Sequence, residues 1–281
     1  EGFEPLLPGF AHIDPPYCYL CPWGKRVESC NLECASALGE KITELGRNRV
    51  AAFIAEPIIG TGGILIPPPG YFEKIRQICT DNDVLFIADE VINGFGRTGK
   101  MFGIEHWDGV VPDLMTMAKG ITSGYVQLGA VALSGEIFDT FKQRERFFHG
   151  FTYSGHPLAC AVGLKNLEII ENEDLVGNAG KMGMVLKEKI QALGLDIIGD
   201  VRGKGLMVGV ELVKNKKTKA KYDPPLAPLV VDTAYKMGLI TRPLIGDILQ
   251  FSPPMVISES QIDDMVNILG KAISKALKDR E

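Results

Sequence analysis

Three ionisable residues, Glu56, Asp89 and Lys119, each follow directly after a short apolar run of the sequence. In open α/β folds the carboxyl ends of parallel strands meet at one edge of the sheet, and ligands bind there. If the apolar runs are strands of this kind, two acids and one lysine converge on one site. A charge at a single strand end usually shows only that the strand has reached water, but three in succession favour a functional site.

These residue types suit chemistry that passes through an imine. A solvated lysine has a pKa of about 10.4, whereas burial at the end of a strand lowers that pKa and makes the amine a nucleophile. A lysine that forms an imine and an acid that pairs with a heterocyclic nitrogen are the two protein groups that pyridoxal phosphate chemistry requires. We therefore expect Lys119 to lie close to both acids and, if its strand is buried, to be desolvated.

One predicted βαβ unit and a further strand would position the three residues. The runs Val50–Ala55, Val84–Ala88 and Leu114–Ala118 are continuous and apolar, which is typical of strands that are covered on both faces of a parallel sheet. Between the first two runs, Tyr71–Asn82 has one apolar face at helical spacing. Residues 50–89 therefore have the order and length of an ordinary βαβ unit.

The rest of the pattern predicts an α/β fold in two parts. Apolar residues at helical spacing predict a helix over Asn31–Leu45, and Gly46 is placed to end it. We expect residues 1–174 to form part of a large domain with a mainly parallel sheet. We expect residues 175–281 to form a small C-terminal α+β domain.

Several elements after residue 174 support this second domain. The pattern predicts one helix and three strands, at Leu175–Leu193, Gly205–Val213, Leu239–Arg242 and Ile248–Ser252. A capping box of Ser258 and Gln261 begins a last, amphipathic helix. The lysine-rich stretch Lys214–Pro225 is predicted to be a solvated connection.

The composition excludes several classes of function. With 281 residues, 46% of them hydrophobic, the chain can bury a large core. A net charge of −5 argues against a nucleic-acid or anionic-membrane surface, because such surfaces need clustered basic residues. No apolar run approaches the roughly 20 residues of a membrane span, and the first ten residues lack a signal-peptide pattern. We expect a cytoplasmic protein that acts on small molecules, with no nucleic-acid or membrane partner.

Four of the six cysteines, Cys18, Cys21, Cys30 and Cys34, form a CxxC followed by a CxxxC. Two such pairs suit tetrahedral thiolate ligation of zinc, but the gap between them is short for such a site, and no Gly-rich turn supports either pair. We therefore predict reduced, buried thiols and no metal site.

Six sequence motifs resemble those of one enzyme family. In chain order they are IAEPIIGTGG, FIADEVINGFGRTGKMFGIEHW, PDLMTMAKGITSGY, LGAVALSGEI, HGFTYSGHPLACAVGL and LITRPLIGDILQFSPPMVIS. They resemble the class III aminotransferases, which are fold type I pyridoxal-phosphate enzymes, and the resemblance extends from about residue 10 onward. The match is specific, because DEVxxGFGRTG followed by the AKG lysine does not arise from composition. The family's N-terminal part is absent, so the resemblance implies a fold type I transferase with an incomplete large domain.

The resemblance implies roles for three residues at the cofactor ring. Lys119 would hold pyridoxal 5′-phosphate as a Schiff base and then move a proton between substrate and cofactor. Asp89 would keep the pyridine nitrogen protonated through a charge-assisted bond. Val91 would pack against the face of the ring, and an ordinary core role is also compatible with its type.

The resemblance also implies roles at the edge of the site. Glu56 matches the family's EP acid near the cofactor, and Thr152 matches the residue that reaches the cofactor phosphate of the other subunit in a homodimer. Turn chemistry alone would also explain Thr152. Arg242 resembles the arginine that binds the substrate carboxylate in pyruvate-using members. Members specialised for 2-oxoglutarate often have a glutamate where this chain has Thr61, which favours pyruvate or glyoxylate as acceptor.

The resemblance thus implies transamination of an omega-amino acid or amine, with pyruvate as the keto acid, most like the omega-amino acid:pyruvate group. The family's phosphate-binding loop and helix N-terminus, and the aromatic residue that stacks on the ring, lie upstream of the matched region. Because these parts of the family are not in this sequence, and because Glu1 rather than Met begins the chain, we expect a missing N-terminal segment. Other pyridoxal-phosphate chemistry on the same scaffold (a phospho-lyase, aminomutase or decarboxylase) stays open, as does a catalytically silent fragment or interaction module.

Overall fold

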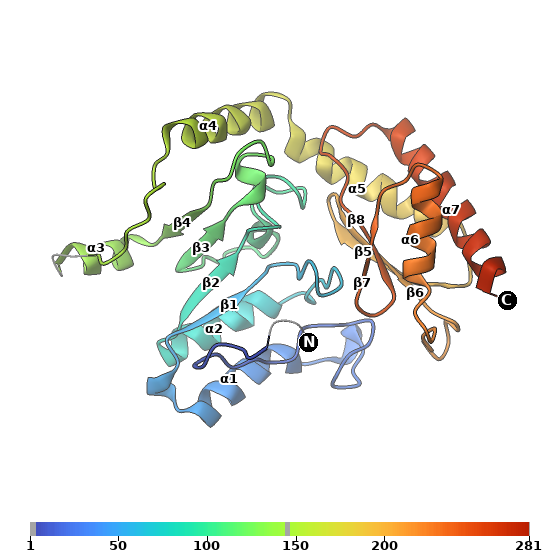
Figure 1. Cartoon of the computed structure of the whole chain (residues 1–281). Coiled ribbons are helices and arrows are strands. Elements are labelled where there is room, and N and C mark those ends of the chain that lie inside the picture. The colour runs from blue at the N-terminus through green and yellow to red at the C-terminus, as the bar shows by residue number, and fades with distance from the viewer. Residues whose placement is uncertain (1–3, 144–146, 281) are drawn as a thin grey trace.

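A computed structural model describes residues 4–143 and 147–280, and Figure 1 shows two sheets with helices packed against them. The elements in chain order are α1 (Glu33–Leu45), β1 (Ala52–Ala55), α2 (Tyr71–Asn82), β2 (Leu85–Asp89), β3 (Leu114–Met117), β4 (Ala130–Leu133), α3 (Gly135–Gln143), α4 (Pro157–Asn172), α5 (Leu175–Ala192), β5 (Ile198–Lys204), β6 (Met207–Leu212), α6 (Ala227–Lys236), β7 (Arg242–Leu244), β8 (Ile248–Phe251) and α7 (Glu259–Arg280). In the described ranges, no helix is long and apolar enough to cross a membrane.

The first sheet has the order β1-β2-β3-β4 and carries the predicted βαβ unit. The strands β1, β2 and β3 are parallel to their neighbours, whereas β4 pairs antiparallel with β3. The prediction of an α/β fold with a mainly parallel sheet is therefore confirmed. The helices α1 and α2 pack on one face of this sheet, where Ile42, Phe72, Ile75 and Phe86 form the centre of a fully buried core.

The prediction that the first three strands are covered on both faces is wrong for β1 and β2. Ile54 of β1 is 50% exposed and Leu85 of β2 is 40% exposed, and Val131 of the added strand β4 is 58% exposed. These apolar side chains lie on the face away from α1 and α2, and strand residues of opposite faces alternate along the chain. The apolar content of the strands thus exceeds what the described helices bury.

The second sheet has the order β5-β6-β8-β7, and all its pairings are antiparallel. The helices α5, α6 and α7 pack against it around a second core, which includes Leu186, Val210, Val230 and Leu269. This is an α+β arrangement, as the pattern after residue 174 predicts. No observation tests the boundary between residues 174 and 175, which stays a prediction.

Some boundaries differ from the predicted ones for local reasons. The helix α1 starts at Glu33 rather than Asn31, because Leu32 adopts a left-handed backbone conformation with φ of 59°. The strand β7 begins at Arg242, so most of the predicted Leu239–Arg242 strand lies before it. The strand β5 was not predicted at all, because its sequence IGDVRGK lacks an alternating apolar pattern.

The two halves lie in close contact at Gly205, in the turn between β5 and β6. A Cβ atom there would lie 2.4 Å from the carbonyl carbon of Thr98 and 2.5 Å from the amide nitrogen of Gly99. Gly205 also has φ of 50°, so a side chain would be strained as well as obstructed. The Arg97 guanidinium spans the same junction and donates to the carbonyls of Leu206 and Pro253, at 3.2 and 2.6 Å.

Candidate functional site

The ends of β1, β2 and β3 bring Glu56, Asp89 and Lys119 to one edge of the first sheet. Glu56 follows β1, Asp89 ends β2, and Lys119 begins a short 3-10 helix (Lys119–Ile121) after β3. Burial raises the pKa of the Glu56 carboxyl, the Gly60 amide lowers it, the charge of Asp89 raises it and that of Lys119 lowers it. The charges of Asp89 and Lys119 therefore both act on Glu56, as convergence at a sheet edge requires.

Lys119 has a strained backbone but an exposed side chain. Its φ of 44° lies in the left-handed region, which is uncommon for a residue with a side chain and costs about 1–3 kcal/mol. Two contacts support this conformation: Asn166 of α4 donates to the carbonyls of Gly120 and Ile121, at 2.8 and 3.2 Å, and Phe95 packs against Gly120. The expected desolvation of Lys119 is not found, because the uncovered face of the sheet leaves the amine open to solvent.

Asp89 and Val91 lie together at the end of β2, and both are half-buried. The carboxylate oxygen Oδ1 of Asp89 accepts a hydrogen bond of 3.1 Å from the amide of Val91, which fixes the turn after the strand. Asp89 is the parallel-sheet partner of Thr116 in β3, so the two side chains share a face, and the buried Thr116 hydroxyl has no hydrogen-bond partner among the described residues. A polar group bound beside Asp89 would have a further partner there.

Asn93 is a buried neighbour of the candidate site that the sequence analysis missed. Its side-chain oxygen accepts from the amide of Ile58 at 3.1 Å, and its side-chain nitrogen donates to the Ile58 carbonyl at 3.0 Å. This fully buried pair of bonds ties the turn after Asp89 to the turn after Glu56. The available signal was a polar residue inside the otherwise apolar and glycine-rich stretch from residue 91 to 96.

Glu90 is fully buried behind this edge and was also missed. Its two carboxylate oxygens accept the amides of Gly103 and Ile104, each at 2.8 Å. Burial raises the pKa of Glu90 to about 7, although the two amides lower it. Glu90 therefore anchors the segment at residues 103–104 and titrates close to neutral pH.

We expect the stability of the fold to depend on the protonation of Glu90. The folded protein raises the pKa from 4.5 to about 7, so the contribution of Glu90 to the free energy of unfolding is fully present below about pH 4.5. That contribution is lost as the pH rises through 7. Urea unfolding across this range should show the stability of the wild type falling relative to Glu90→Gln by about 2–3 kcal/mol. A difference between the two proteins that does not change with pH would contradict the assignment.

No hydrogen bond or ion pair among the described residues links Thr152 or Arg242 to Glu56, Asp89 or Lys119. Thr152 is exposed in a turn between α3 and α4, where the amide of Ser154 donates to the carbonyl of Phe151 at 2.9 Å. Arg242 is exposed at the start of β7, and its Nε donates to the side-chain oxygen of Gln250 at 2.6 Å. Their predicted roles at the cofactor phosphate and the substrate carboxylate stay predictions.

The four N-terminal cysteines line one small pocket with Trp23. Cys34 is buried, whereas Cys18, Cys21 and Cys30 are partly exposed, so the predicted burial holds for one thiol of the four. Burial raises the pKa of the Cys34 thiol to about 11. Within residues 4–143 and 147–280, no group of three or more Cys, His, Asp or Glu side chains is arranged to hold a metal ion.

The arrangement of Lys119 and Asp89 suits the ring and aldehyde ends of pyridoxal phosphate. Lys119 supplies an amine that solvent and a small molecule can reach, and Asp89 supplies a carboxylate from the adjacent strand. An imine-forming amine and a carboxylate for the ring nitrogen form the donor set that this cofactor requires. The strained turn at Lys119 and the Asn93 tie hold these groups in place.

Comparisons with known proteins identify the family of this chain. The family model for aminotransferase class-III matches residues 1–273. Putrescine–pyruvate aminotransferase of Pseudomonas aeruginosa is 43% identical over 272 residues, which are 96% of this chain and 59% of that protein. Diaminobutyrate–2-oxoglutarate transaminase of Halomonas elongata is 41% identical over 287 residues, which are 98% of this chain and 61% of that protein.

A solved structure extends the likeness to the fold. The omega transaminase of Pseudomonas jessenii in complex with PMP is similar with a TM-score of 0.92 and 38% identity, over 99% of this chain and 62% of that one. The chain thus spans about three fifths of the length of the relatives that it matches. A family model that covers nearly all of the chain and relatives above 40% identity show the family. The chain belongs to the class III aminotransferases and has their fold, that of the fold type I pyridoxal-phosphate enzymes.

Proposed function

We propose that this protein transfers the amino group of an omega-amino acid or amine to pyruvate, with pyridoxal phosphate held at Lys119. The observation that carries the proposal is the convergence of Glu56, Asp89 and Lys119 at the carboxyl edge of the first sheet. Pyridoxal phosphate is the cofactor of the class III aminotransferases. When bound, it supplies the electron sink that allows a proton to leave the amino-bearing carbon of the substrate.

In this proposal four residues of the chain have defined roles at the cofactor. Lys119 would hold the cofactor through Nζ, and its amine would move the proton at the amino-bearing carbon of the substrate. Asp89 holds the proton on the ring nitrogen by charge-assisted hydrogen bonding. Val91 packs against the ring, and Glu56, held by the amide of Gly60 at 3.0 Å, orients groups around Lys119. The side chains thus bind, orient and move a proton.

The choice of pyruvate as acceptor rests on Arg242 and Thr61. A planar guanidinium binds a carboxylate through two parallel hydrogen bonds. Arg242 is exposed, and its side-chain contact is a neutral one, to Gln250, so it can exchange that partner for a substrate carboxylate. Thr61 has no carboxylate that could pair with Arg242 when no substrate is bound. One relative is named for pyruvate and another for 2-oxoglutarate, so 2-oxoglutarate is the competing acceptor.

Replacement of Arg242 by Ala should raise the KM for pyruvate by about 10- to 100-fold, because a bidentate charge-assisted contact of about 1.5–3 kcal/mol is lost. The KM for an amine donor without a carboxylate should change little. Steady-state kinetics with the two substrates varied in turn measures both values. If the KM values for both substrates rise equally, or if the KM for pyruvate does not rise, Arg242 does not bind the acceptor.

We further propose that the protein works as a homodimer in which Thr152 reaches the cofactor phosphate of the other subunit. The uncovered face of the first sheet and the exposed aromatic side chains around Thr152 support an additional covering layer. That layer would come from a second copy of the chain and from an N-terminal segment. The domain division at 174/175 and a cytoplasmic location remain predictions.

The function is tested by product analysis. The protein with added pyridoxal phosphate is mixed with β-alanine, taurine or a simple amine, with and without a keto acid. We expect alanine to form from pyruvate, and less glutamate to form from 2-oxoglutarate. Loss of the donor's amino group without a keto acid would instead indicate lyase chemistry on the same scaffold. No product under any condition would support the catalytically silent alternative.

A further inference from the structure

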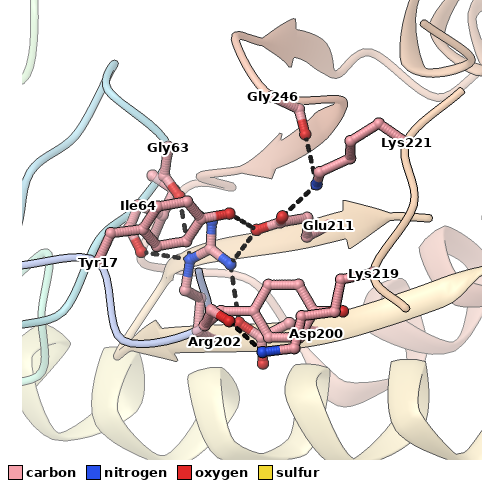
Figure 2. A network of polar contacts seen from close by, with 10 residues as sticks. Tyr17, Gly63, Ile64, Asp200, Arg202, Glu211, Lys219, Lys221 and Gly246 are labelled. Atoms are coloured by element: carbon pink, nitrogen blue, oxygen red, sulfur yellow. Dashed lines mark hydrogen bonds and ion pairs between the residues drawn. The ribbon is translucent and has the colours of Figure 1, made fainter. Parts of the chain in front are cut away.

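Arg202 of β5 joins the second sheet to the loop that follows Glu56, as Figure 2 shows. Its Nε donates to the carbonyls of Gly63 and Ile64, at 3.1 and 2.9 Å, and its Nη2 donates to Gly63 at 2.6 Å. On its other side, Nη1 donates to the carboxylates of Asp200 and Glu211, at 2.7 and 2.6 Å. The planar guanidinium therefore binds two backbone carbonyls of one half of the chain and two carboxylates of the other.

One of the two carboxylates that bind Arg202, that of Glu211, is itself held by other residues. Glu211 is fully buried and also accepts from the hydroxyl of Tyr17 and from the ammonium of Lys221. Lys221 donates further to the carbonyl of Gly246, at 2.9 Å. The prediction that Lys214–Pro225 is a solvated connection is therefore wrong at Lys221. Removing any of the three donors would leave the buried Glu211 carboxylate with an unpaired oxygen, which is energetically costly. The position of Arg202 is therefore fixed by the second sheet and by Tyr17.

The loop that Arg202 binds is strained. Ile64 is fully buried with φ of 52°, a left-handed conformation that a β-branched residue rarely adopts. Such a conformation persists only where surrounding contacts enforce it. The carbonyl of Ile64 is one of the two that Arg202 binds, and its amide donates to the carbonyl of Gly60 at 3.0 Å. Arg202 is thus placed to keep this loop in its strained form.

The same loop ends at the candidate site. The amide of Gly60 donates to the carboxylate of Glu56 at 3.0 Å, while the carbonyl of Gly60 accepts from the amides of Gly63 and Ile64. Arg202 holds the carbonyls of Gly63 and Ile64. A continuous set of hydrogen bonds therefore runs from Glu211 through Arg202 and the 60–64 loop to Glu56.

We propose that Arg202 is a positioning residue, which acts through the 60–64 loop to place the Gly60 amide on the Glu56 carboxylate. The packing of the second sheet on the first then sets the orientation and charge of Glu56. The inference rests on the proposed function only where it assigns Glu56 to the active site. The hydrogen bonds themselves are properties of the chain without a cofactor.

The substitution Arg202→Lys separates positioning from charge. A lysine keeps the positive charge between Asp200 and Glu211, but it lacks the planar fork that reaches both loop carbonyls. A matched control is Arg97→Lys, because Arg97 also spans the two halves through backbone carbonyls but binds those of Leu206 and Pro253. This control shows how the loss of an arginine that joins the two halves of the chain affects the contact between them.

The first measurement is amide hydrogen exchange of the full chain without cofactor. In Arg202→Lys we expect exchange at Gly60, Gly63 and Ile64 to become about 10-fold faster or more, with α2 unchanged. In Arg97→Lys the loop should keep its protection. Unchanged exchange in the 60–64 loop of Arg202→Lys would overturn the proposal. Equal acceleration of loop and α2, or the same loop effect in Arg97→Lys, would show a merely structural role and would overturn it as well.

The second measurement is a carbon NMR titration of the Glu56 carboxyl in the same three proteins. Because the Gly60 amide lowers the pKa of Glu56, loss of that bond in Arg202→Lys should raise this pKa above the wild-type value. A Glu56 pKa that is the same in all three proteins would count against the proposal. Both measurements are made without cofactor or substrate. They can therefore support the positioning role of Arg202 even if the product analysis contradicts the proposed function, and the product analysis can support the function even if Arg202 has no positioning role.

Discussion

The Lys119→Ala variant is expected to lose transamination by a factor of about 10³ or more, the largest effect that we predict. The methyl group of alanine can neither bond to the cofactor nor carry a proton between the reacting carbons. Among the described residues, Lys119 is the only lysine within two residues of the ends of β1, β2 and β3. The fold should survive, because the Lys119 side chain is exposed and contributes little to either core.

Two measurements check this expectation directly. The wild-type chain with pyridoxal phosphate should show the visible absorption band of lysine-bound cofactor, and reduction with borohydride should fix the cofactor to the peptide that contains Lys119. The variant should show neither. The matched control is Lys236→Ala, since Lys236 is an exposed lysine on α6 that pairs only with Asp232 in the described contacts, at 2.6 Å. A band that survives in Lys119→Ala, or cofactor fixed to another lysine, would refute the assignment.

The elements that the sequence predicted well are those with strong local patterns. The helix α2 has the predicted bounds Tyr71–Asn82, because its apolar face recurs at helical spacing. The start of α7 is confirmed by the reciprocal capping bonds of Ser258 and Gln261, at 2.9 and 3.3 Å. The strand β5 could not be found in this way, because pairing with β6 rather than its own residues determines it.

The candidate site also has a part that local sequence patterns predict and a part that depends on long-range contacts. Glu56, Asp89 and Lys119 converge because parallel topology places successive strand ends at one edge, which a sequence pattern can indicate. The exposure of Lys119 could not be predicted, because it depends on which layers cover the sheet. The role of Arg202 was also hidden, since its partners Gly63 and Ile64 lie 139 and 138 residues away. Long-range polar contacts leave no periodic signal.

The Asp89→Asn variant is expected to bind the cofactor but to turn over about 10²-fold more slowly or worse. Asparagine has nearly the same shape, and its side-chain oxygen can still accept the Val91 amide that Asp89 accepts at 3.1 Å. Its neutral amide would not hold a proton on the ring nitrogen, and the charge that Asp89 would supply for turnover is lost. The affinity for the cofactor should fall by about 10- to 100-fold, as expected for loss of a charge-assisted bond.

The control for this variant is Asp83→Asn, at the end of α2. Asp83 is exposed and has φ of 55°, a left-handed conformation that asparagine adopts as readily as aspartate. It therefore reports the effect of the same change of charge away from the site. Cofactor titration followed by absorbance, together with kcat at saturating cofactor, separates binding from turnover. If Asp89→Asn keeps the kcat of the wild type, the ring nitrogen is not held by Asp89. If Asp83→Asn is equally slow, the effect belongs to net charge rather than to the site.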